Sequence, residues 1–158
     1  MGRFVFDEWL WADLSGENGE QAECEALRLL EAVFARCDQL VTVYGSAFLE
    51  KFYGLAVRAV TGDRRRQVVR VFKSQFLENG EKLRILQEGD LPEIPPEVGH
   101  NVKEEDRYLV RAYVAGRADL LVTTDRPLME VLSGSRIRCR ERGAFMSSYL
   151  GGGALGEE

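Results

Sequence analysis

The chain has 158 residues, 45% hydrophobic and 30% charged, which is the composition of a single globular domain with a substantial core. Its formal net charge of −5 argues against a protein that coats nucleic acid non-specifically, although an acidic nuclease site would itself contribute negative charge. One histidine, His100, and three cysteines without metal-ligand spacing argue against a histidine-based catalytic triad and a His/Cys zinc site.

The first part of the chain alternates short apolar runs with helical patterns. RFVF, at residues 3–6, predicts a strand that ends at Asp7. Apolar residues then recur at helical spacing over about 21–36. QLVTVY, at 39–44, predicts a second strand, and Ser46 is a candidate N-cap for a helix to about residue 60.

The middle of the chain continues the same alternation. A basic helix is expected to extend to about residue 77, and KLRILQ, at 82–87, predicts a third strand. The segment 88–102 contains three prolines and should be irregular. A helix over about 104–116 and a buried strand at 120–122 follow.

The end of the chain carries weaker patterns. Pro127 suits the first turn of a short helix, and RIRCR, at 136–140, predicts a last edge strand. Residues 1–150 are expected to form one domain, followed by a disordered Gly-rich tail at 151–158. The apolar runs are too short to span a bilayer and no targeting signal is recognised, so we expect a cytoplasmic protein without membrane association.

Strands that alternate with helices at this spacing predict an α/β fold in three layers, with a mainly parallel central sheet flanked by helices. Sites in such sheets lie outside the carboxyl ends of the strands. Four acids occupy these positions. Asp7 ends the first strand, Glu50 lies one turn into the helix after the second, Asp106 opens a later helix, and Asp125 ends its return strand.

The segment EEDRYLVRAYVAGRADLLVTTD, at 104–125, links two of these acids by length. From Asp106 the helix rises about 15 Å at 1.5 Å per residue, and the strand returns about 16 Å at 3.3 Å per residue. Because the two lengths nearly cancel, Asp106 and Asp125 should meet at one edge of the sheet. Adjacent carboxylates repel each other unless a cation or a proton lies between them, so the segment points to a cation site.

Each of these acids also has a purely structural interpretation. Asp106 can be read as an acid that stabilises a helix start, and its neighbour Glu105, which borders the same apolar face, could substitute for it. Asp125 can be read as the N-cap of the helix at Pro127, a role compatible with metal binding. Glu50 falls at the margin of the buried face of its helix.

At these residues the sequence resembles the PIN-domain family of metal-dependent ribonucleases, which includes the VapC-type toxins of toxin–antitoxin pairs. FVFDEWL places Asp7 as the aspartate that ends the first strand, and YGSAFLEKF matches a Ser-led helix start followed by a glutamate, Glu50. The 104–125 segment resembles the unit in which an aspartate opens the penultimate helix and a Thr-x-Asp-like turn ends the next strand. Glu8 and Trp9 stand where the family commonly has a small polar residue and Asn, so Glu8 is expected to substitute in part.

The resemblance implies a PIN-like endoribonuclease that uses Mg²⁺ or Mn²⁺. Asp7, Asp106 and Asp125 would hold the metal directly or through water, and Glu50 would complete the catalytic cluster. Hard cations prefer such carboxylate oxygens, and the metal would activate a bound water and neutralise charge on the phosphate. The resemblance also implies RNA as the substrate, a homodimer, and an antitoxin partner if the protein is a toxin.

Other polar residues are candidates for contacts with the substrate. Thr124 could hydrogen-bond a scissile phosphate or an acidic neighbour, or be an ordinary hydroxyl at a strand end. A basic group could contact RNA phosphates or simply form a solvated helix face. The members of this basic group are Arg64, Arg65, Arg66, Arg70 and Lys73.

Two other functions remain open. One is a PIN-like module that binds RNA or protein, with a cleavage site weakened at Glu50. The other is a phosphoryl-transfer domain, such as a phosphatase or receiver, which also clusters acids at strand ends but needs a lysine after a late strand that this sequence lacks. Metal binding without cleavage would favour the binding module.

Overall fold

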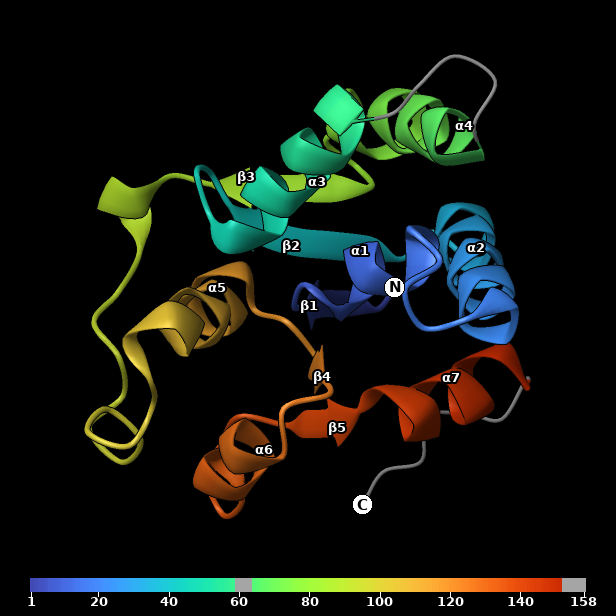
Figure 1. Cartoon of the computed structure of the whole chain (residues 1–158). Coiled ribbons are helices and arrows are strands. Elements are labelled where there is room, and N and C mark those ends of the chain that lie inside the picture. The colour runs from blue at the N-terminus through green and yellow to red at the C-terminus, as the bar shows by residue number, and fades with distance from the viewer. Residues whose placement is uncertain (59–63, 152–158) are drawn as a thin grey trace.

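The computed structural model describes residues 1–58 and 64–151 (Figure 1). In these residues five strands form one sheet in the order β3-β2-β1-β4-β5, and all four pairings are parallel. The α/β fold with a parallel central sheet is therefore confirmed. The strands are β1 (Arg3–Phe6), β2 (Gln39–Val43), β3 (Leu83–Leu86), β4 (Leu120–Thr123) and β5 (Cys139–Glu141).

Helices cover both faces of the sheet, with α5 and α6 on the left in Figure 1 and α2 and α7 on the right. Within the described ranges the helices are α1 (Trp9–Leu14), α2 (Glu20–Ala35), α3 (Ala47–Arg58), α4 (Arg64–Phe72), α5 (Arg107–Gly116), α6 (Arg126–Leu132) and α7 (Arg142–Leu150). A π-helical turn (Lys73–Leu77) extends α4, and 3₁₀ turns lie at Glu88–Asp90 and Glu104–Asp106.

The two faces of the sheet form separate cores because successive strand residues point to opposite sides. Phe4 and Phe6 pack into a cluster with the side chains of α1, α2, α3, α4 and α7. Val5 and Leu121 pack into a second cluster with α5, α6 and the loop around Val98. Burial on both faces explains why the three inner strands, β1, β2 and β4, are mostly apolar.

Several element boundaries differ from those predicted. The last strand begins at Cys139 rather than at residue 136. Ile137 lies in the loop before it, where its side chain is buried and its backbone N–H donates to Ser135 Oγ at 3.1 Å instead of to a neighbouring strand. It does lie at the edge of the sheet, as expected. Helices α1 and α7 were not predicted. The expected end of α3 near residue 60 and most of the tail fall in residues 59–63 and 152–158, outside the described part of the chain. None of the described helices has the length and apolar character needed to cross a membrane.

The carboxyl end of α5 packs closely on the sheet at Gly116. A Cβ atom placed there would lie 2.5 Å from Val41 Cγ1 on β2. Gly116→Ala should therefore overpack this contact and lower the free energy of unfolding by about 1–2 kcal/mol, the lower part of the usual range because the helix ends here and can shift. Urea denaturation measures the change.

Gly54→Ala is the matched control. Gly54 lies within α3, and nothing lies within 4 Å of a Cβ added there, so alanine should be neutral or stabilising by up to about 1 kcal/mol. Equal stabilities of the Gly116 and Gly54 variants would show that α5 does not depend on this close approach.

Candidate functional site

The acidic residues gather where the strand order reverses. The chain first builds β1, β2 and β3 outward in one direction and then returns to place β4 on the other side of β1. This reversal opens a crevice at the carboxyl ends of β1 and β4, the usual ligand site of an open parallel sheet. Asp7 follows β1 directly, and Asp125 follows β4 after one intervening residue.

Asp7 is held in one orientation by two hydrogen bonds. Its side chain is buried, Oδ1 accepts from the backbone N–H of Trp9 at 3.0 Å, and Oδ2 accepts from the hydroxyl of Thr123. Thr123 Oγ1 in turn accepts from the backbone N–H of Asp125 at 3.0 Å. Thr123, a buried residue at the end of β4, therefore connects Asp7 to the backbone of Asp125.

Two sets of contacts hold Trp9, the first residue of α1, in place. Trp9 Nε1 donates to the carbonyl oxygen of Val122 on β4 at 2.8 Å. The Arg142 guanidinium lies 5.8 Å from the Trp9 ring centre and donates to Asp13 at 2.7 Å and to Glu25 at 2.9 Å. These contacts join α1, α2 and α7 behind the site and explain why Trp9 packs in the core rather than at the surface.

Asp125 has the structural role that its sequence context suggested. It is the N-cap of α6, and its Oδ1 accepts from the backbone N–H of Leu128 at 3.1 Å. Its second carboxylate oxygen is not needed for this bond, so capping and metal binding are compatible.

Asp106 ends the 3₁₀ turn before α5 and occupies the N-cap position, but its side chain makes no capping hydrogen bond. The carboxylate instead lines a small hollow together with Asp125, Lys103, Asn101 and Leu128. The predicted meeting of the acids at 106 and 125 is thus observed: the helix and its return strand bring both to one hollow.

Burial and mutual repulsion perturb the acids. Burial is the largest cause that raises the pKa of Asp7 to about 6, with the Glu8 and Asp106 charges adding to it and the bonds from Thr123 and Trp9 opposing it. Burial also raises the pKa of Asp106 to about 6, followed by the charges of Asp125, Glu105 and Glu8. Acids with raised pKa values in a crevice are typical of functional sites.

Glu8 and Glu105 thus lie near enough to influence the central acids. Glu8 precedes α1, and its Oε1 accepts from the hydroxyl of Tyr108 on α5 at 3.4 Å. Burial and the Glu8 and Asp7 charges raise the pKa of the Tyr108 hydroxyl, which stays protonated and able to donate. Glu105 is exposed beside Asp106.

Two of the predicted residues are exposed at the surface. Glu50 is exposed in the first turn of α3, and the charges with the largest effects on Asp106 come from Asp125, Glu105 and Glu8. Thr124 is exposed in the turn after β4, and the hydroxyl that bonds an acidic neighbour belongs to Thr123, one residue earlier. Catalytic or substrate-binding roles for Glu50 and Thr124 stay predictions.

The site also includes a thiol that the sequence did not single out. Cys139 begins β5, and burial raises its pKa to about 12, with the charges of Asp7 and Asp125 adding to the effect. The register pairs it with Leu121 on β4, so it lies beside the crevice. Neither Thr123 nor Cys139 has a sequence signal beyond its place near a strand end.

Carboxylate oxygens are the donors that Mg²⁺ and Mn²⁺ prefer. Nevertheless, within residues 1–58 and 64–151 no group of three His, Cys, Asp or Glu side chains is arranged to hold an ion jointly. Asp106 and Asp125 share a hollow. Asp7 is connected to the backbone of Asp125 through Thr123, and it lies near enough to Asp106 for that charge to raise its pKa. The donor set thus suits a hydrated cation held by two carboxylates rather than a closed protein cage.

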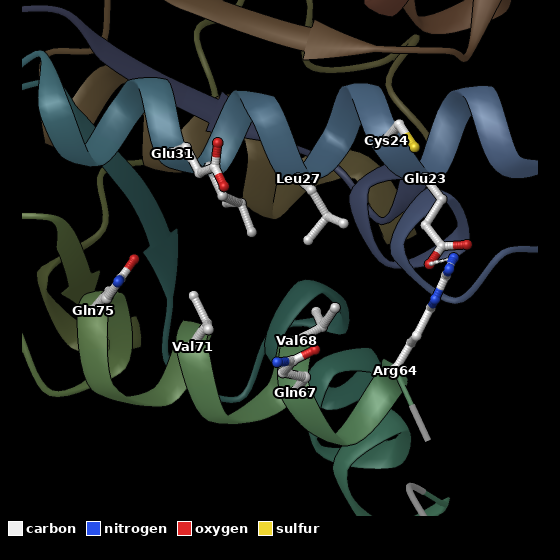
Figure 2. Close-up of a pocket in the computed structure, with 10 residues that line it drawn as sticks. Glu23, Cys24, Leu27, Glu31, Arg64, Gln67, Val68, Val71 and Gln75 are labelled. Atoms are coloured by element: carbon white, nitrogen blue, oxygen red, sulfur yellow. Dashed lines mark ion pairs between the residues drawn. The ribbon is translucent and has the colours of Figure 1, made fainter. Parts of the chain in front are cut away.

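The basic helix α4 lies against α2 rather than standing free. Figure 2 shows Arg64 reaching across to Glu23, and the charged groups are 4.0 Å apart. Arg65 Nη2 donates to the carbonyl oxygen of Ser15 at 3.3 Å, and Lys73 pairs with Glu78 at 3.9 Å. Between the two helices lies a largely apolar groove whose walls include Leu27, Val68 and Val71 (Figure 2).

No known family profile matches the chain, and no curated protein matches its sequence. Among solved structures, the fold is similar to that of a chain in the crystal structure of VapBC2 from Rickettsia felis bound to a DNA fragment from their promoter. The chains are 11% identical and align with a TM-score of 0.53 over 88% of this chain and 98% of the other. At this identity the likeness is one of fold, and the parallel sheet with its flanking helices is consistent with a PIN-like fold.

Proposed function

We propose that the protein is a PIN-like endoribonuclease that hydrolyses RNA phosphodiester bonds with Mg²⁺ or Mn²⁺. The observation that carries this proposal is the gathering of Asp7, Asp106 and Asp125 at the crevice where the strand order reverses. The similarity of fold to a chain of a VapBC2 structure supports it.

The residues at the crevice fit a hydrated hard cation. Mg²⁺ is usually bound through one or two carboxylates, keeps several waters, and uses substrate phosphates as further ligands. Asp106 and Asp125 would hold the ion in their shared hollow, and Asp7 would contribute through water. When bound, the ion would lower the pKa of a coordinated water and neutralise charge on the phosphate.

The protein residues would hold the cation and orient the reactants. Thr123 and Trp9 fix the Asp7 carboxylate, so it cannot turn away from the crevice. Asp106 is only partly buried and lines the hollow, so its carboxylate is better placed than that of Asp7 to bind the cation directly. Burial and the charges of Asp125, Glu105 and Glu8 raise its pKa to about 6 in the metal-free protein, and a bound cation would oppose this shift and keep the carboxylate ionised. Glu50 would act from the rim of the site.

The partners implied by this function are RNA, a second copy of the chain, and an antitoxin-type protein. The basic residues of α4 and the turn after it, including Arg66 and Arg70, would add phosphate contacts outside the crevice. The protein in the similar structure is bound to a DNA fragment and named as VapBC2, which supports an antitoxin partner for this chain.

A second candidate function is a PIN-like module that binds a protein or RNA without efficient cleavage. The observation that favours it is the apolar groove between α2 and α4, because amphipathic peptide helices bind in grooves of this kind.

The decisive experiment is incubation of the purified protein with a mixed RNA pool, with Mg²⁺, with Mn²⁺ and with EDTA. Metal-dependent cleavage supports the nuclease, and RNA binding without cleavage supports the module.

Divalent cations should also raise thermal stability, because a bound cation relieves repulsion that exists only in the folded protein. At a Mg²⁺ concentration about tenfold above the dissociation constant, the melting temperature should rise by about 3–5 °C. Differential scanning fluorimetry in EDTA and in millimolar Mg²⁺ or Mn²⁺ measures the shift.

Asp125→Asn should reduce this shift, and Asp90→Asn, a change at an exposed acid after β3, should leave it intact. Equal shifts for the two variants would place the cation elsewhere on the protein, and no shift in the unmodified protein would count against a metal site.

A further inference from the structure

A second hollow adjoins the acidic one at the start of α5. It has a volume of about 550 Å³ and is lined by Glu93, Ile94, Pro96, Gly99, His100, Arg107 and Arg111. Asp106 faces the first hollow and Arg107 lines the second. Because consecutive Cα atoms are only 3.8 Å apart, one helix start separates the two hollows. The loop before it contributes to both, through Asn101 to Lys103 on one side and Gly99 and His100 on the other.

The two arginines of the second hollow differ in how firmly they are held. Arg111 Nη1 donates to Glu88 at 2.6 Å and its Nε donates to the carbonyl oxygen of Pro92 at 2.8 Å, so its charge is neutralised locally. Arg107 is exposed, and its guanidinium makes a 3.4 Å contact with the carbonyl oxygen of Gly99, which is long for a hydrogen bond. The Arg107 guanidinium can thus bind an anion without giving up a short hydrogen bond to the Gly99 carbonyl oxygen.

We propose that this hollow is a phosphate subsite for the RNA strand, with Arg107 as its main contact and His100 beside it. The inference rests on the proposed function, since it takes the scissile phosphate to lie at Asp106 and Asp125. A strand placed there would carry a neighbouring phosphate past the start of α5 and toward Arg107.

A positively charged subsite would offset the repulsion between the acidic crevice and the RNA backbone. The acids of the crevice repel the RNA backbone, so a strand needs compensating positive charge close to the reacting phosphate. Arginine suits this task because its planar guanidinium can bind a phosphate through two parallel hydrogen bonds. Arg64 on α4 is less suitable because it already pairs with Glu23 on α2, and α4 packs on the face of the sheet opposite to α5.

The test uses the full chain and a fluorescein-labelled single-stranded RNA of 12 nucleotides with mixed sequence, in EDTA to prevent cleavage. Arg107→Ala should weaken binding about tenfold, the loss expected for one charge-assisted hydrogen-bonding group. It should also make the dependence of log K on log salt shallower by about 0.7, the value for one phosphate contact on a single strand. Arg107→Lys should recover part of both quantities because it keeps the charge.

The matched control is Arg138→Ala, which removes an exposed arginine just before β5, at the amino ends of the parallel strands and beside Tyr113 near the other end of α5 from Arg107. It should leave RNA affinity and salt dependence unchanged. In Mg²⁺, Arg107→Ala should raise the KM for RNA cleavage with little change in kcat, and Arg138→Ala should change neither.

Each failure has its own signature. If the unmodified protein cleaves RNA and Arg107→Ala matches Arg138→Ala in affinity, salt slope and KM, the subsite is wrong and the nuclease stands. If the unmodified protein neither binds nor cleaves RNA in any metal, the proposed function falls and the subsite falls with it. If a polyglutamate peptide binds through Arg107 and RNA binding is indifferent to it, the hollow is a site for acidic protein segments and the phosphate subsite is overturned.

Discussion

Replacing Asp125 by Asn should lower the rate of RNA cleavage in Mg²⁺ or Mn²⁺ by about 100-fold or more. The change removes one of the two carboxylates in the hollow, and a loss of about 3 kcal/mol of transition-state stabilisation is a modest share of what a catalytic metal supplies. Asn is as good an N-cap as Asp, so the bond to the Leu128 N–H and the start of α6 should survive. Single-turnover cleavage of a labelled RNA gives the rate.

The same assay separates the central acids from the peripheral ones. Asp106→Asn should cause a loss of similar size, and Glu50→Gln, at an exposed position, should cause a smaller one. Asp90→Asn is the matched control and should retain the full rate. A rate for Asp125→Asn within about threefold of the unmodified protein, with its fold intact, would be incompatible with the proposed active site.

Replacing Asp7 by Asn should stabilise the metal-free protein at pH 7.5 by up to about 3 kcal/mol while abolishing cleavage. The pKa of Asp7 is raised from 3.8 to about 6, a shift of about two units, and each unit corresponds to about 1.4 kcal/mol. The folded state therefore binds more protons than the unfolded state between pH 4 and 6. The stability that Asp7 contributes in its protonated form is complete below about pH 4 and is lost as the pH rises through 6.

Urea denaturation in EDTA at pH 4.5 and pH 7.5 measures the free energy of unfolding and its dependence on pH. The unmodified protein should lose stability between the two conditions, and Asp7→Asn should lose less, because asparagine does not titrate. Asp106, whose pKa is also raised, should keep part of the dependence in the variant. If Asp7→Asn were instead less stable than the unmodified protein at pH 7.5, the ionised Asp7 side chain would not destabilise the folded state, and the prediction would be wrong.

Part of the fold and of the site follows from local patterns. The strands β1, β2, β3 and β4 are short apolar runs between helical repeats, and an α/β alternation leaves few arrangements other than a parallel sheet. The unit from Asp106 to Asp125 could be placed from lengths alone, because its helix and strand are adjacent in sequence.

The unpredicted elements are those whose residues lack a local pattern. α1 has six residues, five of them buried, so no polar face gives it a helical period. α7 follows β5 without a break, and its Arg142 is fixed by Asp13 and Glu25 from more than a hundred residues earlier. The choice between Thr123 and Thr124 depends on where β4 ends to a single residue, and only the pairing with β1 decides that.

The central place of β1 in the sheet has a consequence for biosynthesis. Its two neighbours are β2, which follows within forty residues, and β4, whose partner residues begin at Leu120. A ribosome releases the chain from the N-terminus, so the outer half β3-β2-β1 can assemble while β1 still has an open side. Asp7 meets Thr123 and Asp125 only after β4 has emerged and closed that side, a late and long-range step of the kind that slows folding. A nascent chain that lacks β4 therefore carries no complete acidic crevice, and any activity toward RNA would begin only after β4 has emerged and paired with β1.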